Sequence, residues 1–421
     1  MNETRLAMRM NGWAVVAVVC VLILAAQAGA YEVGHVTRDW YDAERDISVD
    51  VEVYYPATEA GNNVPVAIPP EGGFPSIAFG HGYLIPWSDY SYIWEELVPE
   101  GFILLMATGR SGLFPDHEQF GLDLAFLVDE MYARSMDPES GWYEKISTKS
   151  AVIGHSMGGG ASVLAAAYNP EIDVVINLAA AETSPSAIQA AASVEVPMML
   201  LAGWNDCVTP LEDHQLPMYS ALASETRALI NLDGATHCQF CNYNFTCELG
   251  EFSCPDPEIS REEQHDRVIE FSLPFLQYFL YDELAAWAEY REKVETGEGF
   301  DYAFDTDVPL FLIKVSADEE PVRIPSDGGE VEFTFELASS RGFTTMGSAW
   351  LSIQMPNGNV IGPLGFQSLT LPPYFAIEPM TGSQDIPGPA PDGQYEFRIQ
   401  AGRYPNLIVA QDTLVVIKGD E

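Results

Sequence analysis

Apolar segments alternate with amphipathic ones through the middle of the chain, and this alternation constrains the fold more than any other feature. Strand-like runs such as 76–82 and 149–155 have apolar centres with no alternation of polar residues, whereas residues 117–135 carry apolar side chains at helical spacing. Strands that are apolar on both faces and alternate with helices form a parallel sheet covered on both sides. We therefore predict an α/β fold with a mostly parallel central sheet, spanning residues 31–296.

The pattern changes after this region. Residues 297–308 are glycine-rich, acidic and aperiodic, which predicts a linker; calcium binding by Asp301, Asp305 and Asp307 is a less favoured alternative. Residues 309–421 contain strand-like runs separated by turn residues and show no helical period. This predicts a small all-β sandwich as an accessory domain.

The first 30 residues are typical of a secretory signal peptide. Arg5 and Arg9 precede an apolar run at 13–26, and small residues at 26–30 offer a cleavage site. An uncleaved membrane anchor is the alternative, but the run is short for a span. We expect a protein exported from the cytoplasm, secreted, periplasmic or attached to the cell surface, with no stable membrane span after cleavage.

The net charge of the chain limits the kinds of macromolecule that it can bind. The chain has 62 acidic and 19 basic residues, a net charge of −43, and 47% hydrophobic residues. Such a surface repels nucleic acid and anionic membranes, so we expect no nucleic-acid partner. The hydrophobic content is sufficient for a large core. Composition predicts no oligomeric state.

The segment "AVIGHSMGGGAS" at 151–162 places Ser156 where a predicted strand turns into a helix. Bulky neighbours would clash at such a turn, so Gly154 and Gly158 leave room for the backbone. The helix that follows brings N–H groups and the positive end of its dipole beside the hydroxyl. We therefore predict that Ser156 is a catalytic nucleophile.

A serine nucleophile needs a base, and one of the seven histidines is well placed for that role. His237 follows the last strand predicted for the sheet, and loops at the carboxyl ends of parallel strands converge. His155 adjoins the serine but points away from it. His117 opens a predicted helix, and His214 and His265 fall within helices, where packing is the expected role. We therefore predict that His237 is the base.

The base needs a carboxylate to orient it. Asp206 lies in the loop "GWNDCVTP", which follows the penultimate strand. The order serine, aspartate, histidine is the one expected on this fold. Asp213 and Asp233 are weaker alternatives, because Asp213 falls in a helix and Asp233 is too close to His237 in sequence. The predicted triad is therefore Ser156, Asp206 and His237.

An oxyanion formed during acyl transfer needs backbone N–H donors. The residue after the nucleophile, Met157, is predicted to supply one, and Tyr83, in the loop after the strand at 76–82, the other. The Tyr83 ring is also predicted to line the acyl pocket, with plain packing as the alternative. No cofactor or metal is expected.

Five cysteines lie within residues 207–254, which suggests disulfides in an exported chain. They are Cys207, Cys238, Cys241, Cys247 and Cys254. Zinc is a weaker alternative, since the C-x2-C pair has no second pair with similar spacing. Because the acid and base loops must meet, we predict a bridge from Cys207 to Cys238 or Cys241, and a local Cys247–Cys254 bridge. The odd number leaves one thiol free or paired elsewhere.

The motifs "GHSMGGGAS", "GWNDCVTP", "HQLPMYSAL" and "GATHC", together with the Gly-Tyr loop, resemble those of dienelactone hydrolase-type α/β-hydrolases. The resemblance is to the polyester hydrolase branch, with its PET hydrolases and cutinase-like lipases, and covers residues 75–279. It implies an α/β-hydrolase fold and the same triad and oxyanion donors.

The chain also departs from the polyester hydrolase pattern at its predicted substrate surface. His155 stands where polyester hydrolases usually carry tryptophan, and "LAAAETS" at 178–184 replaces their aromatic residue. This difference argues against activity on aromatic polyesters. We expect His155 and Trp204, with Tyr83, to contribute to substrate binding.

Residues and resemblance together predict a secreted serine esterase of the lipase or polyester-hydrolase kind, acting on a small or polymeric ester. Two alternatives stay open: a serine peptidase, and a catalytically silent binding or adhesion protein on a hydrolase scaffold. Peptide cleavage is less favoured, because no gating domain precedes the sheet. An intact triad argues against a silent scaffold.

Overall fold

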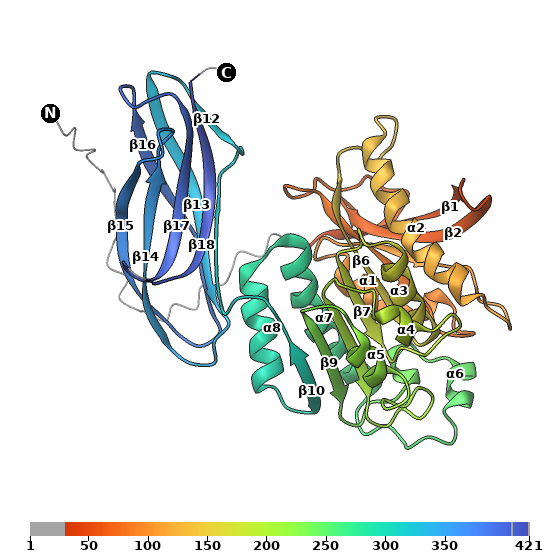
Figure 1. The fold of residues 1–421 in the computed structure, drawn as a ribbon. Coiled ribbons are helices and arrows are strands. Elements are labelled where there is room, and N and C mark those ends of the chain that lie inside the picture. The colour runs from red at the N-terminus through yellow and green to blue at the C-terminus, as the bar shows by residue number, and fades with distance from the viewer. Residues whose placement is uncertain (1–29, 406, 420–421) are drawn as a thin grey trace. The chain divides into compact units, whose positions relative to one another are not determined.

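A computed structural model describes residues 30–405 and 407–419. These residues form two compact units, one built from residues 30–282 and 297–308, the other from residues 283–296 and 309–419. The first is an α/β unit and the second is mostly β (Figure 1). All of the predicted signal peptide except Ala30 lies outside the described residues.

The α/β unit is organised around a ten-stranded sheet with the order β10-β9-β8-β7-β6-β4-β5-β2-β1-β3. The strands β5, β4, β6, β7, β8 and β9 pair in parallel, while β2 and β1 extend the sheet as antiparallel strands. The parallel strands are β4 (Phe74–Gly80), β5 (Ile103–Ala107), β6 (Ile146–His155), β7 (Val174–Leu178), β8 (Met198–Gly203) and β9 (Arg227–Leu232). Beyond β5 the sheet continues with β2 (Ile47–Ala57), β1 (Glu32–Asp42) and the edge strand β3 (Gly61–Asn62). Every residue of β4, β5, β7 and β8 is buried, which confirms the predicted α/β fold with a mostly parallel sheet.

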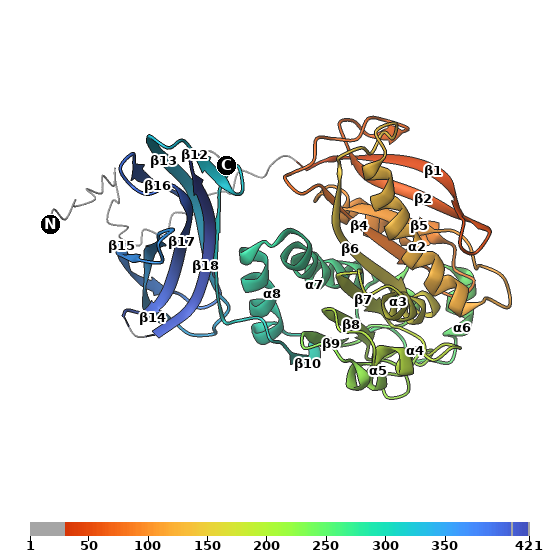
Figure 2. The same cartoon turned by 45° about the horizontal axis from the view of Figure 1, so that its top comes forward.

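Helices cover the sheet on both faces (Figure 2). Along one face run α2 (His117–Met136), α3 (Met157–Tyr168), α4 (Ala187–Ala191) and α5 (Gln215–Ala221), each in contact with the next. On the other, α1 (Ser91–Leu97) packs against α7 (Arg261–Tyr281), and the short α6 (Phe245–Gly250) belongs to an excursion after β9. Side-chain caps start the two long helices: Asp116 accepts from Gln119 N–H (3.1 Å), and Ser260 from Glu263 N–H (3.0 Å).

The predicted linker at 297–308 is wrong in part. Residues Phe300–Asp305 form β10, which pairs antiparallel with β9 along six residues and closes that edge of the sheet. The Tyr219 hydroxyl and Arg227 Nε each donate a hydrogen bond to Asp305 Oδ2 (3.0 Å each). These bonds hold β10 against the α/β unit. The segment therefore belongs to the α/β unit.

The second unit is a two-sheet sandwich, as predicted for residues 309–421, together with α8 (Leu284–Thr296), which packs on β13 and β16. One sheet has the order β11-β13-β16 and the other β12-β18-β17-β14-β15. Their strands are β11 (Phe311–Ser316), β12 (Val322–Ile324), β13 (Gly328–Ser339), β14 (Thr345–Gln354), β15 (Val360–Leu371), β16 (Phe375–Pro387), β17 (Gly393–Arg403) and β18 (Leu407–Lys418). Val331, Phe397 and Leu414 are fully buried between the sheets.

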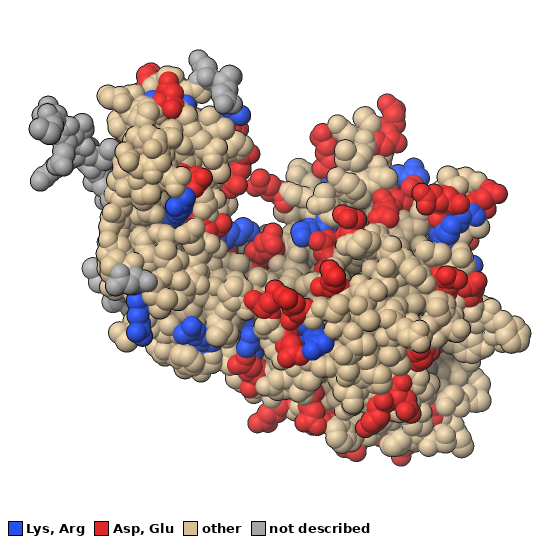
Figure 3. Space-filling model, in the orientation of Figure 1, with Lys and Arg blue, Asp and Glu red and all other residues tan. Residues whose placement is uncertain are grey.

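Acidic side chains predominate among the charged residues on the visible surface of the α/β unit. In Figure 3, Asp and Glu are spread over this face and outnumber Lys and Arg. The distribution agrees with the net charge of −43. An anionic macromolecule approaching this face would be repelled.

Candidate active site

Ser156 occupies the turn between β6 and α3 with φ 55° and ψ −117°, a conformation that is strained for a residue with a side chain. Its N–H donates to the carbonyl of Leu178 (2.9 Å) at the end of β7. Its carbonyl accepts from the N–H groups of Ala181 (2.8 Å) and Gly160 (3.1 Å). Bonds to the neighbouring strand, the following loop and the helix thus hold the strained turn.

Glycine is required on both sides of this turn. A Cβ atom on Gly154 would lie 2.1 Å from the carbonyl oxygen of Gly158, and one on Gly158 would lie 2.0 Å from that of Gly80. The strand and helix backbones are therefore in direct contact, and no side chain fits between them.

His237 lies between the serine and a carboxylate. Its Nε2 is 2.9 Å from Ser156 Oγ, and its Nδ1 is 2.8 Å from Asp206 Oδ2. Because a carboxylate only accepts, Nδ1 carries the proton, and the lone pair on Nε2 can take the serine proton. The His237 and Asp206 side chains are 3% and 2% exposed, so water does not weaken this pair.

Asp206 is kept ionised by its neighbours. Burial would raise its pKa, but His237 and the hydrogen bonds from Thr209 outweigh this effect and lower the pKa below its ordinary value. Its Oδ1 accepts from the N–H groups of Val208 and Thr209 (2.8 Å each), and the Thr209 hydroxyl donates to Oδ2 (2.8 Å). A fixed, ionised carboxylate stabilises an imidazolium that forms beside it.

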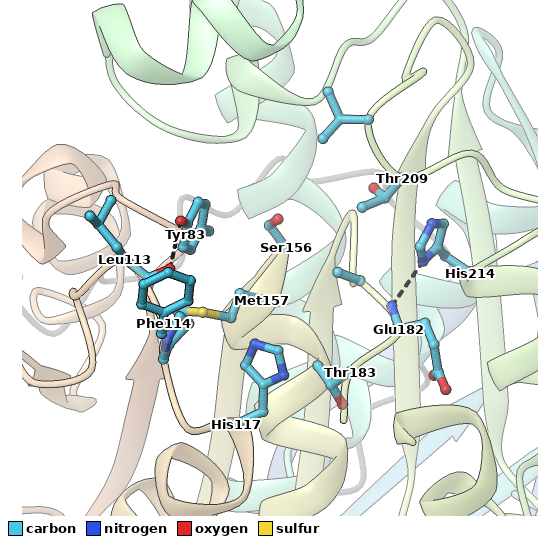
Figure 4. A pocket seen from close by; sticks show the side chains of 13 residues that line it. Tyr83, Leu113, Phe114, His117, Ser156, Met157, Glu182, Thr183, Thr209 and His214 are labelled. Carbon is cyan, nitrogen blue, oxygen red and sulfur yellow. Dashed lines mark hydrogen bonds between the residues drawn. The ribbon is translucent and has the colours of Figure 1, made fainter. Parts of the chain in front are cut away.

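A pocket of about 520 Å³ opens at Ser156. Figure 4 shows Tyr83, Leu113 and Phe114 on one side of the serine and Thr209 and His214 on the other. The Tyr83 hydroxyl donates to the Leu113 carbonyl (2.9 Å) and ties two wall loops together. Tyr83 and Met157 both line the pocket, and their role as oxyanion donors stays a prediction.

Residues 46–254 match the family described as PET hydrolase-like. The α/β unit is a PET hydrolase-like domain with the α/β-hydrolase fold. The resemblance inferred from the motifs is thereby confirmed.

Relatives of the PET hydrolase-like domain include Cutinase 2 of Thermobifida cellulosilytica, 29% identical over 165 residues, which is 38% of this chain and 60% of the relative. Cutinase cut1 of Thermobifida fusca is also 29% identical over 165 residues, 38% of this chain and 49% of the relative. A bis(hydroxyethyl) terephthalate hydrolase of Streptomyces coelicolor is 27% identical over 187 residues, 44% of this chain and 54% of the relative. The chain thus spans about half to three fifths of the length of these curated relatives.

Two residues expected to contact substrate lie elsewhere. His155 is completely buried, and its Nδ1 is 2.8 Å from the Tyr90 hydroxyl, so its ring forms part of the interior behind the turn. Trp204 is 60% exposed and does not line the pocket. Of the predicted substrate-binding residues, only Tyr83 lines it.

The predicted disulfide pairing is wrong. The bridges are Cys207–Cys254 and Cys238–Cys247, and Cys241 is a free, buried thiol. The acid and base loops are therefore not joined directly. The chain after the base loop folds back through α6, so that Cys247 returns to the base loop and Cys254 reaches the acid loop.

The excursion that carries these cysteines also bonds the base loop through Glu251. Its carboxylate accepts from the Cys238 N–H (3.2 Å) and from the Thr236 hydroxyl (3.3 Å), the residues on either side of His237. Burial raises the pKa of Glu251, against the lowering effect of the Cys238 N–H bond and of His237. The excursion thus fixes the backbone on both sides of His237.

Three residues of the site were missed or misplaced at the level of sequence. Thr209 follows Asp206 by three positions, a spacing typical of capping turns that would have pointed to it. His214 precedes α5 instead of lying within a helix, and it lines the pocket together with His117. No sequence signal indicates where these two imidazoles point.

Proposed function

We propose that this protein is a secreted serine esterase that hydrolyses carboxylic esters through an acyl-enzyme formed on Ser156. The single observation that carries the proposal is the hydrogen-bonded chain from Ser156 through His237 to Asp206 at the base of a pocket. Relatives named as cutinases and a bis(hydroxyethyl) terephthalate hydrolase support an ester substrate.

The proposed reaction begins with attack of Ser156 Oγ on the ester carbonyl while His237 Nε2 takes the serine proton. The N–H groups of Met157 and Tyr83 stabilise the oxyanion. The tetrahedral intermediate collapses and releases the alcohol, which receives the proton from His237. Water then attacks the acyl-enzyme with His237 again as base, and the carboxylic acid leaves.

Pocket composition favours aliphatic esters over aromatic polyesters. The loop after β7, which carries an aromatic residue in polyester hydrolases, presents Glu182 and Thr183 to the pocket here. Tyr83 and Phe114 are the benzene-type rings among the described lining residues, and both lie on the opposite side (Figure 4). These two rings would therefore stack on an aromatic acyl group from one side only.

Export is part of the proposal. The signal-like segment at 1–30 and the two disulfides support an oxidising compartment outside the cytoplasm. Within the described residues, none of the helices has the length and apolar character needed to span a bilayer.

The test is hydrolysis of p-nitrophenyl esters, triglyceride emulsion and polyester film by the wild-type protein and by Ser156→Ala. The expected result is ester turnover that falls roughly 10⁴- to 10⁶-fold in the variant, with unchanged circular dichroism. Cleavage of peptides with no ester turnover would support a serine peptidase. Failure of every substrate would support a silent scaffold.

A further inference from the structure

Two histidines line the pocket away from the triad, and neither has a role in the proposed acyl transfer. His117 is the first residue of α2, and His214 precedes the first residue of α5. Both lie on the pocket wall with Thr183 between them in Figure 4. The two rings come from separate elements, yet the same loop holds both of them.

Backbone N–H groups of this loop determine where each neutral ring carries its proton. Glu182 N–H donates to His214 Nδ1 (2.8 Å), and Ser184 N–H donates to His117 Nδ1 (3.2 Å). A ring nitrogen that accepts a hydrogen bond carries no proton, so each neutral ring has its proton on Nε2. Each ring thus offers one N–H donor that the loop does not use.

His214 is held in this neutral form. Burial lowers its pKa below the ordinary value, against the opposing effect of the carboxylates of Asp206, Asp213 and Glu182. A protonated ring would also lose the bond from the Glu182 N–H, because Nδ1 would then be a donor. At His214, the pocket wall therefore presents an N–H donor without a fixed positive charge.

We infer that His117 and His214 form a subsite that binds a second carbonyl of the substrate, so that esters carrying another ester group in the chain are preferred. The inference rests on the proposed function. Neutral N–H donors match a neutral carbonyl acceptor. A carboxylate is disfavoured, because Glu182 lines the same wall and the protein carries a net charge of −43.

The test uses pairs of substrates that differ in one internal ester group. On the acyl side, p-nitrophenyl heptanoate is compared with the p-nitrophenyl ester of monomethyl glutarate, which has the same chain length. On the alcohol side, pentyl acetate is compared with ethylene glycol diacetate, and hydrolysis of both is monitored by the acid that is released. The readout is the ratio of kcat/KM for the diester to that for the monoester, in each variant relative to wild type, so that intrinsic reactivity cancels.

Substitution by asparagine or by glutamine tests the two ring nitrogens of each histidine separately. In His117→Asn and His214→Asn, the amide oxygen takes the place of Nδ1 and still accepts from the loop, but the Nε2 donor is lost. In His117→Gln and His214→Gln, the amide nitrogen takes the place of Nε2, but the Nδ1 acceptor is lost. We expect each Asn variant to lower the ratio roughly 3- to 10-fold for one of the substrate pairs, and each Gln variant to retain it.

The ratio of diester to monoester kcat/KM in the Asn variants tests whether the subsite exists. An unchanged ratio for both substrate pairs would overturn the inference, as would losses that affect monoester and diester equally, because the rings would then only support the loop. Turnover of monoesters by the wild-type protein, together with an unchanged ratio, contradicts this subsite alone. Absence of turnover on all four substrates contradicts the proposed function itself.

Discussion

The Tyr90 hydroxyl and His155 Nδ1 lie 2.8 Å apart in the interior, behind the turn that carries Ser156. The same hydroxyl accepts from Gly82 N–H (2.9 Å), in the loop that presents Tyr83. Burial, with His237 alongside, holds the pKa of His155 well below its ordinary value, so the ring stays neutral and its Nδ1 can accept from Tyr90. One tyrosine thus links the loop that presents Tyr83 to His155, the residue before Ser156.

Tyr90→Phe is expected to lower kcat on a p-nitrophenyl ester by roughly 10-fold with little change in KM, because a displaced oxyanion donor weakens transition-state binding more than substrate binding. Tyr92→Phe is the matched control, since Tyr92 is also buried but donates to the Phe240 carbonyl (3.1 Å). Equal kcat values for Tyr90→Phe and wild type would show that Tyr90 does not position the loop.

The two disulfides should differ in their contribution to stability. Cys207–Cys254 closes 47 residues and Cys238–Cys247 closes 9. On the chain-entropy model these bridges contribute about 4 and about 2.6 kcal/mol. Replacing both cysteines of the longer bridge by serine is therefore expected to lower the melting temperature more than replacing both of the shorter one.

Scanning calorimetry of the two double variants measures this order, with Cys241→Ala as the control that breaks no bridge. The opposite order would show that contacts of the excursion with the base loop, such as those of Glu251, matter more than loop closure.

Because of His265, we expect the free energy of unfolding to fall in acid. Burial, and to a lesser extent Arg261, lowers its pKa to about 4, although nearby backbone carbonyls oppose the shift. The unfolded chain binds this proton near pH 6.5, so between about pH 6.5 and 4 the unfolded state holds more protons and the free energy of unfolding falls as the pH falls. His265→Phe retains a ring to stack on Tyr92, whose centroid lies 3.7 Å away, and cannot titrate.

Melting temperatures of wild type and His265→Phe between pH 7 and 4 test this linkage. The difference between the two proteins should shift in favour of the variant as the pH falls. Parallel curves over the whole range would contradict the expectation.

The mostly parallel sheet could be predicted from the local alternation of strands and helices, and the meeting of the three triad side chains could be predicted from the convergence of loops at one sheet edge. Ser156, Asp206 and His237 all follow strands that end at that edge. The disulfide pairing depends on the path of residues 242–254, which no periodicity reveals. β10 has alternating Phe300, Tyr302 and Phe304, but its acidic residues obscure the strand pattern, and an edge strand tolerates such charges.

The most direct test of Ser156 as an activated nucleophile is labelling of the full-length protein with a fluorophosphonate, read by intact mass and peptide mapping. The predicted result is one adduct per chain on the peptide that contains Ser156, no adduct in Ser156→Ala, and strongly slowed labelling in His237→Ala, because His237 accepts the serine proton. Absence of an adduct in the wild-type protein, or an equal adduct in Ser156→Ala, would contradict the assignment of this site.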